Sequence, residues 1–492
     1  MNLLLLLDMV AAGRGDEVVV QAGDVRLTAA ELLAAAWGGA ALAEGSSALA
    51  YVGTNGLAFP IGLFAAAAAG LPFVPLNYRL SEEQLHDLLA PLGDTLVVAE
   101  GEAATTLAAR GHRVVTAEDF VATARAGGAG DVPADGEGEA VLLYTSGTTA
   151  APKAAVLRHR HLAAYVVETV EFAGAGPDEA VLVSVPPYHV AGLANLLSNL
   201  YAGRRVVYLS QFDADAWVDA VRREGITNAM VVPTMLARIC DALEAGGGDL
   251  PTLRALSYGG ARTPATVLER AMRLLPDAAF TNAYGLTETS STIAVLGPDD
   301  HRAARDGDPV ATARLGSAGR VLPGVEVEVR DPLGVALPDG ETGEIWVRGE
   351  QVSGEYAGRE APLDAAGWFP TRDRGWLDAD GYLFIEGRSD DTIIRGGENI
   401  APAEIEEVLL QHPGIAQVAV VGVPDDEWGQ RIAAVVVLRP GASLDAAEVQ
   451  EFARRSLRGS KTPEIVSFAE ALPFTETGKL LRRVVQADLL PS

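Results

Sequence analysis

Short apolar runs rich in β-branched residues alternate with amphipathic segments in the first half of the chain, and this alternation limits the folds open to it. The runs at 182–185, 205–209 and 229–232 have the length of buried strands, and the patterns at 161–172 and 215–223 have helical spacing. A parallel strand pair needs a long crossover, so strands separated by helices indicate a parallel sheet. We therefore predict an α/β fold with a large, layered N-terminal domain.

The pattern changes in the second half of the chain. The segments "VEVEVR" (325–330) and "EIWVRG" (344–349) alternate apolar and polar residues with a period of two. Such alternation is typical of half-buried antiparallel strands. We predict a β subdomain at about 315–388, inside an N-terminal domain of residues 1–388.

The last segment, 389–492, starts a new set of elements after a stretch rich in charges and glycine. Helical patterns at 405–412 and 446–457 accompany strand-like runs at 418–423 and 432–438. A chain of 492 residues is too long for one compact core. We expect these last residues to form a separate small α+β domain.

The composition argues against a nucleic-acid-binding, membrane-bound or disulfide-linked protein. A net charge of −28 argues against nucleic acid or an anionic membrane as a partner. The single cysteine, Cys240, excludes an intramolecular disulfide, suits a reducing cytoplasm and is expected in the core. The uncharged stretch 57–76 is long enough to imitate a membrane span, but it contains Pro60, Pro72 and Pro75. We predict a buried helix there, no membrane partner and a cytoplasmic protein.

The stretch "YTSGTTAAPKAA" (144–155) places hydroxyls, a glycine and a lysine directly after an apolar run. A P-loop needs its lysine between a glycine and a hydroxyl residue, whereas Lys153 lies between Pro152 and Ala154. The loop can still surround a polyphosphate with backbone N–H groups and hydroxyls, to which Lys153 adds positive charge. An ordinary Ser/Thr-rich surface loop explains the run equally well. The small and hydroxyl residues concerned are Thr145, Ser146, Gly147, Thr148 and Thr149.

Six further segments follow this loop in a fixed order. They are "PPYHVAGL" (186–193), "SYGGA" (257–261), "NAYGLTET" (282–289), "TRDRGWLDADGYLFIEGRSDD" (371–391), "GGENIAPAEIEE" (396–407) and "PFTETGKLLRR" (473–483). With the loop they resemble the adenylate-forming superfamily, which includes acyl-CoA synthetases, adenylation domains and luciferases. Ala150, Ala154 and Arg372 stand where that family usually has glycine. The resemblance covers most of the chain and implies a small, mobile C-terminal domain that carries a catalytic lysine.

The resemblance implies that ATP converts a carboxylic acid to an acyl adenylate with release of pyrophosphate. Both reactants are anions, so the site must neutralise charge. Glu288 suits Mg²⁺, which takes one or two carboxylates and phosphate oxygens. Asp373 suits the two ribose hydroxyls, because a carboxylate has two acceptor oxygens. The residues expected to bind ATP or AMP are Thr145, Ser146, Gly147, Thr148, Thr149, Lys153, Gly260, Ala261, Asn282, Tyr284 (against the adenine), Gly285, Thr287 (on the α-phosphate), Asp373 and Arg388 (as a second ribose contact).

Lys479 is the expected catalytic cation. It follows Gly478 at the tip of a turn, and by resemblance it bridges the carboxylate and the α-phosphate. With it, Glu288 and Thr287 complete the predicted catalytic set, and Glu288 is the predicted metal ligand. Two plainer alternatives remain at this point: Glu288 as a solvated surface charge, and Asp373 in a surface ion pair with Arg374.

The acid-binding pocket is expected to be apolar and aromatic. Adenylation domains for amino acids usually carry an aspartate in the motif that "PPYHVAGL" resembles, and this chain has none there. An aryl or medium-sized acyl acid fits better, with Asn195 as a polar contact. The expected substrate-binding residues are Tyr188, His189, Asn195, Gly259 and Gly260. Arg262 either pairs with a second acidic group of the substrate or lies at the surface.

Coenzyme A is the expected acceptor of the acyl group. The segment 452–483 holds seven Lys/Arg and three Asp/Glu, a local charge of +4 in an acidic chain, which suits a bound polyanion. An amphipathic basic helix explains that charge as well. Gly396 and Gly397 would let a thin pantetheine arm pass close to the backbone, Trp428 would contact the CoA base, and Asp390 would be the hinge.

Two other functions remain open from the sequence. A stand-alone adenylating enzyme would pass its adenylate to a carrier-protein thiol or another nucleophile. A nucleotide-binding sensor or scaffold is the non-enzymatic alternative, and the presence of both Glu288 and Lys479 argues against it. The sequence does not fix the oligomeric state, and a homodimer remains one hypothesis.

Overall fold

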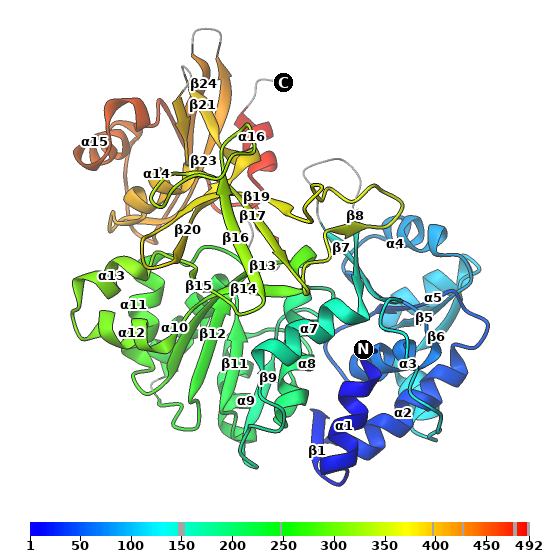
Figure 1. The fold of residues 1–492 in the computed structure, drawn as a ribbon. Coiled ribbons are helices and arrows are strands. Elements are labelled where there is room, and N and C mark those ends of the chain that lie inside the picture. Colours follow the sequence, from blue (N-terminus) through cyan, green and yellow to red (C-terminus); the bar gives the residue numbers. More distant parts are fainter. Residues whose placement is uncertain (146–152, 247, 396–397, 426–427, 476–479, 490–492) are drawn as a thin grey trace.

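The computed structural model describes residues 1–145, 153–246, 248–395, 398–425, 428–475 and 480–489. Two large sheets form its body (Figure 1). Among these residues the first sheet has thirteen strands, in the order β16 (Val325–Arg330), β17 (Gly343–Gly349), β19 (Phe369–Leu377), β20 (Tyr382–Arg388), β15 (Gly319–Val321), β14 (Ser291–Leu296), β13 (Ala279–Leu286), β12 (Ala255–Gly259), β11 (Asn228–Val231), β9 (Ala180–Val183), β10 (Arg205–Tyr208), β1 (Val18–Ala22) and β2 (Val25–Thr28). The second has seven, in the order β18 (Glu355–Tyr356), β8 (Lys153–Arg158), β7 (Glu139–Thr145), β4 (Phe73–Pro75), β3 (Ala48–Val52), β5 (Thr95–Ala99) and β6 (Arg113–Thr116).

The predicted parallel sheet is confirmed. Strands β10, β9, β11, β12 and β13 lie in this order and pair in parallel with one another, and β13 pairs antiparallel with β14 on its other side. β9 is a continuous apolar run, as expected of a strand covered on both faces. β9 ends at Val183, two residues before the predicted end, since the run leads into Pro186 and Pro187, which cannot donate ladder hydrogen bonds.

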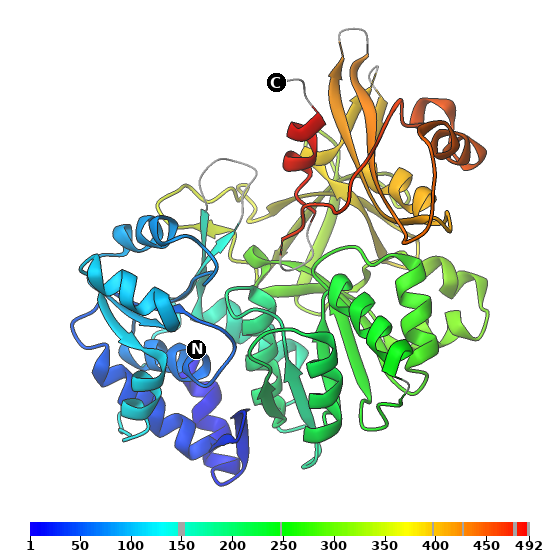
Figure 2. The ribbon, with the colours of Figure 1, turned by 180° about the vertical axis from the view of Figure 1, so that it is seen from behind.

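Helices surround both sheets, as Figure 2 shows from behind. Helix α9 shows how the sequence sets their limits: the Asp213 side chain accepts from the Ala216 N–H at its start, and Gly225 closes it with a φ of 62°. The helices of this part are α1 (Leu4–Arg14), α2 (Ala29–Leu42), α3 (Ala58–Ala69), α4 (Glu82–Leu89), α5 (Gly101–Ala109), α6 (Ala117–Ala124), α7 (His159–Thr169), α8 (Val190–Ala202), α9 (Ala214–Glu224), α10 (Pro233–Gly246), α11 (Ala265–Leu274), α12 (Pro298–Arg305) and α13 (Pro309–Arg314), with short 3₁₀ turns η1 (Ala90–Leu92) and η2 (Thr287–Thr289).

The uncharged stretch at 57–76 forms the buried helix that we predicted. Helix α3 is buried along almost its whole length and ends at Gly70, whose φ is 68°. It packs against α2, in the core of the N-terminal half. None of the helices in the described part of the chain is long and apolar enough to cross a membrane. Cys240 is buried as expected.

The period-two segments form antiparallel strands, as predicted. β16 pairs with β17 from Val325↔Gly349 to Arg330↔Glu344. These strands do not form a sheet of their own, because β15 pairs with both β14 and β20 and so joins them to the large sheet. The division at 388, which falls at the end of β20, stays a prediction.

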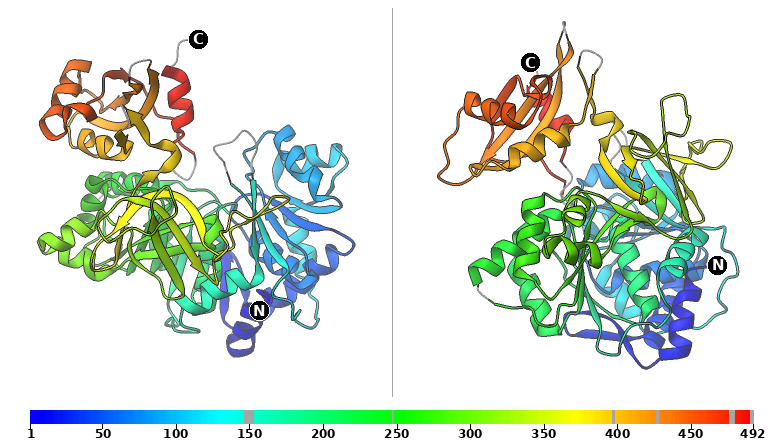
Figure 3. Two further views of the ribbon diagram at one scale, coloured as in Figure 1. Left: turned by 45° about the horizontal axis from the view of Figure 1, so that its top comes forward. Right: turned by 60° about the vertical axis from the view of Figure 1, so that its left-hand side comes forward.

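The C-terminal elements lie at one end of the molecule (Figure 3). Strands β23 (Ile415–Asp425), β24 (Gly429–Leu438) and β25 (Ile465–Phe468) form a sheet beside the hairpin β21 (Ile393–Arg395) and β22 (Glu398–Ile400). The even-numbered residues Val418 and Val420 pack with α14 (Pro402–Leu410) and α15 (Ala446–Ser456), and the odd-numbered Ala419 and Val421 pack with α16 (Arg482–Leu489). Both faces of β23 are covered, which explains its unbroken apolar sequence. The turns η3 (Ser389–Asp391) and η4 (Gly459–Lys461) complete this part.

The second sheet carries one strand from the distant β region. β18 has only two residues, and it pairs with β8 through Glu355↔Val156 and Tyr356↔Ala155. The Arg158 guanidinium donates to both carboxylate oxygens of Glu355, from Nε at 2.9 Å and from Nη2 at 2.7 Å. Since both side chains are about three-quarters buried, this bidentate ion pair fixes β18 on the edge of the sheet.

We predict that Glu355→Gln lowers the free energy of unfolding by about 1 kcal/mol, because it removes one charge of a partly buried bidentate pair. Glu326→Gln is the matched control: Glu326 makes a bidentate pair with Arg348 across β16 and β17, but both side chains are more exposed. Urea unfolding followed by circular dichroism measures both variants. An equal effect at the two positions would contradict the role given to burial.

Candidate active site

The two sheets meet at Glu288, in the turn η2. The Tyr356 hydroxyl donates to Glu288 Oε1 at 2.6 Å. The backbone N–H groups of Ser353 and Gly354 donate to the Glu288 carbonyl at 2.9 and 3.3 Å. The residue is half-buried, with its carboxylate held by Tyr356 and its backbone by Ser353 and Gly354, which does not fit the alternative of a freely solvated surface charge.

Tyr356 belongs to this site, although we did not predict it from the sequence. Its ring lies beside Lys153, whose Nζ is 5.7 Å from the ring centroid. Burial and then the Glu288 carboxylate raise the pKa of the Tyr356 phenol, so it stays a hydrogen-bond donor. No motif marks this tyrosine, and Glu288 is 68 residues away in the chain. Only the pairing of β18 with β8 reveals it.

A second buried carboxylate, Asp373, lies on β19. Its Oδ2 accepts from the Tyr284 hydroxyl at 2.6 Å, and its Oδ1 accepts from Arg388 Nη1 at 3.1 Å. Asp373 is 6 % exposed and faces Arg388 directly across β19 and β20. The alternative pairing with Arg374 is therefore wrong. Successive residues of a strand point to opposite faces, which separates the Arg374 side chain from that of Asp373.

The charges of this cluster act on one another. Burial opposes the charge of Arg388, but Asp373, Tyr284 and Glu288 together raise the pKa of its guanidinium. Burial and then Asp373 raise the pKa of the Tyr284 phenol well above its ordinary value. Two carboxylates from separate segments, Asp373 and Glu288, thus both stabilise the positive charge of Arg388.

Arg372 has a backbone conformation that glycine adopts more easily. Its φ is 61°, in the left-handed region, and its side chain is exposed. This is the position at which the resemblance leads one to expect glycine. The observed φ is one that glycine adopts without strain, which agrees with that expectation.

Several predicted residues fall outside the part of the chain that the structure describes. The phosphate loop is seen only at its two ends, Thr145 at the end of β7 and Lys153 at the start of β8, where Thr145 Oγ1 donates to the Lys153 carbonyl at 3.4 Å. The residues outside the description are Ser146, Gly147, Thr148, Thr149, Gly396, Gly397 and Lys479.

The wall formed by β12 and β13 depends on glycine for space. A Cβ on Gly259 would lie 2.2 Å from the Ala283 carbonyl oxygen, and one on Gly285 would lie 1.7 Å from that of Ser291. Gly260 has a φ of 81°. Asn282 Nδ2 donates to the Ser317 carbonyl at 3.0 Å, so that side chain also holds β13 to the following loop. Ala261 and Thr287 lie at the ends of this wall, after β12 and β13.

The predicted acid-binding residues lie around the start of α8. The ring centroid of Tyr188 is 4.6 Å from that of His189 and 5.9 Å from that of Tyr78. Burial lowers the pKa of His189 to about 4, so the imidazole is neutral at pH 7. Asn195 lies within α8 and is 7 % exposed.

The other predicted residues lie in the C-terminal part. The ring of Trp428, 42 % exposed, has the Arg395 guanidinium 4.5 Å from its centroid, and Arg395 in turn pairs with Glu464 at 2.6 Å. Asp390 lies in the turn η3, directly after β20. Their predicted roles, CoA contact and hinge, stay predictions.

Arg262 follows the glycine wall and pairs with Glu407 on α14. The Nη2 to Oε2 distance is 2.6 Å, and both side chains are about half exposed. Of the two roles proposed from the sequence, the structure supports the surface one. The pair links the large body to the C-terminal elements.

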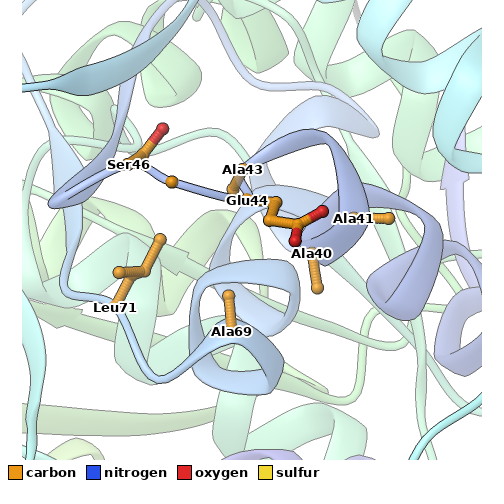
Figure 4. Close-up of a pocket in the computed structure, with 8 residues that line it drawn as sticks. Ala40, Ala41, Ala43, Glu44, Ser46, Ala69 and Leu71 are labelled. Atoms are coloured by element: carbon orange, nitrogen blue, oxygen red, sulfur yellow. The ribbon is translucent and has the colours of Figure 1, made fainter.

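Two pockets lie away from these carboxylates. One of about 330 Å³ lies between the ends of α2 and α3, lined by small side chains and by Glu44 (Figure 4). It brings together no set of groups that could do chemistry. The other, of about 200 Å³, is lined by the segments that follow β3, β4, β9, β10 and β11, and it includes Arg79 and Arg238. It lies at the carboxyl ends of parallel strands, where α/β proteins commonly bind ligands.

The sequence matches two family models and many known proteins. A model described as AMP-binding enzyme matches residues 7–357, and one described as AMP-binding enzyme C-terminal domain matches residues 404–479. The chain is similar to feruloyl-CoA synthase from an Amycolatopsis species, with 37 % identity over 443 residues that cover 89 % of this chain and 88 % of the relative. It is also similar to the fatty acid–[acyl-carrier-protein] ligase ScoC from Streptomyces coeruleorubidus, with 34 % identity and 90 % and 87 % coverage.

Solved structures resemble the whole fold. The o-succinylbenzoate CoA synthetase MenE from Bacillus subtilis, in complex with its acyl-adenylate intermediate, has a TM-score of 0.84 and 27 % identity, covering 98 % of this chain and 97 % of that one. ATP-bound MatB from Rhodopseudomonas palustris has a TM-score of 0.87 and 28 % identity, covering 99 % of both chains.

We predict that the protein loses stability in mild acid, because burial lowers the pKa of three histidines in the N-terminal part. Burial lowers the pKa of His159, His161 and His189 from an ordinary 6.5 to about 4 in the folded state. Between these values the unfolded chain binds protons that the folded chain does not. The free energy of unfolding should therefore fall as the pH drops from 6.5 toward 4, by up to about 1.4 kcal/mol per pH unit for each histidine.

Urea unfolding at pH 7, 6 and 5 tests this expectation. The variant His189→Gln should lose one histidine's share of the pH dependence and keep the rest. The same slope in the wild type and in this variant would show that His189 titrates normally in the folded state.

Proposed function

The chain belongs to the family of AMP-binding enzymes, and we propose that its site activates an aryl or medium-sized carboxylic acid as an acyl adenylate and passes the acyl group to CoA. The relatives described above are CoA or acyl-carrier-protein ligases, and the solved structures include one with ATP and one with an acyl-adenylate intermediate. The observation that carries the proposal is the cluster around Arg388. Asp373 pairs with this arginine, and the charge of Glu288 helps to raise its pKa. These residues stand in the motifs of the family, and the fold brings them together.

Asp373 would bind the ribose of ATP. Tyr284 and Arg388 fix the carboxylate in one orientation before any ligand arrives. A buried carboxylate is costly unless it is paired and hydrogen-bonded, so this arrangement favours a built acceptor over an incidental charge. A vicinal diol supplies two donors for the two oxygens.

Glu288 would hold Mg²⁺. Tyr356 occupies Oε1, and none of the described residues hydrogen-bonds Oε2. Among those residues there is also no group of three His, Cys, Asp or Glu side chains around a common point. A single carboxylate beside a phosphate loop matches the ligand set of Mg²⁺, which keeps waters and phosphate oxygens. When bound, the ion would screen the charge of the polyphosphate.

Lysine is rare in this chain compared with arginine. Its three lysines are Lys153, Lys461 and Lys479, against 35 arginines. Lys461 pairs with Glu404 at 2.6 Å. The other two lie in the phosphate-loop and C-terminal motifs. An ammonium on a flexible stem can follow a charge that moves during reaction, which a planar guanidinium does less well. We propose Lys479 as the cation that bridges the carboxylate and the α-phosphate.

The acceptor arm would enter through the 200 Å³ pocket. In the large sheet β9 lies between β10 and β11, so the chain continues from β9 to one side and later returns to the other side. In the second sheet β3 lies between β4 and β5 in the same arrangement. The pocket lies at both switch points, and its Arg79 and Arg238 suit the phosphates of CoA. A carrier-protein thiol is the second candidate acceptor, favoured by the similarity to an acyl-carrier-protein ligase.

A panel of aryl, medium-chain and amino acids, assayed for pyrophosphate release with and without CoA, tests the function. We expect release with aryl or medium-sized acids, no release with α-amino acids, and an acyl-CoA product when CoA is present. Activation without CoA consumption would support the carrier-protein alternative. The absence of release with any acid would refute the enzymatic proposal.

The variant Lys479→Ala should lose adenylation by about a hundredfold or more while it still binds ATP. Lys461→Ala is the matched control, because it removes a lysine of the same C-terminal region that pairs with Glu404. Acid-dependent ATP–pyrophosphate exchange measures the first effect, and fluorescence titration with a nucleotide analogue measures binding. Unchanged exchange in Lys479→Ala would remove this residue from the mechanism.

A further inference from the structure

Glu288 offers few oxygen atoms to a cation, because other groups already use most of them. Its backbone carbonyl accepts from the N–H groups of Ser353 and Gly354, at 2.9 and 3.3 Å. A carbonyl oxygen has two lone pairs, and these two donors use both. The side-chain Oε1 accepts from the Tyr356 hydroxyl at 2.6 Å. Among the described residues, Oε2 is therefore the one oxygen of Glu288 without a donor.

The hydrogen bond from Tyr356 to Oε1 is a strong one. Its length is that of a charge-assisted O–H···O⁻ bond, which is about twice as strong as a bond between neutral groups. A carboxylate only accepts, so the phenol directs the positive end of its O–H dipole at Oε1. A cation that takes both carboxylate oxygens must approach this positive end or displace the phenol. The contact therefore favours a cation that uses Oε2 alone.

The sheet holds the phenol in this place. Tyr356 lies on β18, and the next N–H, that of Ala357, donates to the Ala154 carbonyl of β8 at 2.9 Å. The preceding residue, Glu355, is tied to Arg158 by the bidentate ion pair described above. The donor to Oε1 is thus fixed on both sides along the chain, and it does not follow the carboxylate if a cation turns it.

Mg²⁺ and Ca²⁺ need different things from such a site. Ca²⁺ takes about six to eight oxygen ligands, including both oxygens of a carboxylate and backbone carbonyls. Mg²⁺ keeps several waters and is usually held by one or two carboxylates together with substrate phosphates. The described residues contain no group of three His, Cys, Asp or Glu side chains that would complete a larger ligand set. A single open carboxylate oxygen suits Mg²⁺ and disfavours Ca²⁺.

We propose that Tyr356 makes the site select Mg²⁺ over Ca²⁺, because its hydroxyl restricts Glu288 to one ligand oxygen. This inference rests on the proposed function, which assigns the metal to Glu288, and it names the ion that is rejected and the residue that rejects it. Tyr356 is a positioning residue, since it acts through Glu288. Ser353 and Gly354 add to the selection, because their N–H groups occupy the Glu288 carbonyl.

The test compares the binding of MgATP and CaATP by isothermal titration calorimetry, with each metal in excess and no acid present. We expect the wild type to bind MgATP about tenfold more tightly than CaATP, because Ca²⁺ must disturb a charge-assisted hydrogen bond to gain its second oxygen. Tyr356→Phe keeps the ring and removes the donor. In this variant the ratio should fall about three- to tenfold, chiefly because CaATP binds more tightly.

Two further variants separate this effect from a general loss of structure. Tyr382→Phe is the matched control, because the Tyr382 hydroxyl also donates to a carboxylate, Asp300 Oδ1 at 2.9 Å, but between β20 and α12. It should keep the wild-type ratio. Glu288→Gln removes the charge of the ligand and should abolish most of the preference for MgATP. ATP without metal, in the presence of EDTA, should bind equally to the wild type and to Tyr356→Phe.

Each outcome decides the inference. A structural role of Tyr356 would weaken both complexes alike, and an unchanged ratio in Tyr356→Phe, folded by circular dichroism, overturns the proposal. Equal affinities of the wild type for MgATP and CaATP overturn it without any variant. Both results leave the proposed function intact where acid-dependent pyrophosphate release is observed. If Glu288→Gln keeps the wild-type affinity for MgATP, the metal ligand of the proposed function is wrong, and this inference fails with it.

Discussion

The pairing of a two-residue strand, β18, with β8 is the contact on which the site depends. It carries Tyr356 from the β region onto the edge of the second sheet, where the phenol lies between Lys153 and Glu288. The ion pair of Arg158 with Glu355 fixes this junction from the neighbouring residue. Without the junction, the phosphate loop and the Glu288 turn would belong to two sheets with no fixed relation. Catalysis of a reaction between anions needs such a fixed relation, since a misplaced charge stabilises little.

A protein with a net charge of −28 can still bind a polyanion when single cations lie at the binding site. Arg388 is partly buried, donates to Asp373 and to the Thr371 carbonyl, and is a fixed charge. Lys153 lies at the start of β8, at the base of the phosphate loop. Apart from Lys461 the chain uses arginine for its other cations, and lysine at 153 and at 479 agrees with our proposal that these two charges adapt to a ligand. The acidic surface then serves solubility and discourages other polyanions.

The sequence predicted those features of the fold and site that depend on local pattern or on motif order. Period-two alternation predicted that β16 and β17 are antiparallel strands, and the motifs singled out Glu288 and Asp373. The partner of Asp373 was also within reach of local reasoning, because Arg374 must point to the opposite face of β19. Tyr356 was not within reach, since its strand is too short to show a period and its contact spans 68 residues.

The strained backbone of Arg372 is offset by electrostatic interactions within the site. A non-glycine residue in the left-handed region costs on the order of 1 kcal/mol. The next residue is Asp373, so this backbone turn sets the direction in which the carboxylate that we propose for the ribose points. The guanidinium also acts on Tyr356, where its field opposes the effect of burial and of Glu288 on the phenol's pKa. Glycine would relieve the strain but remove the positive charge whose field also favours the ionised form of Glu344. This favourable field offsets part of the cost of the strained arginine.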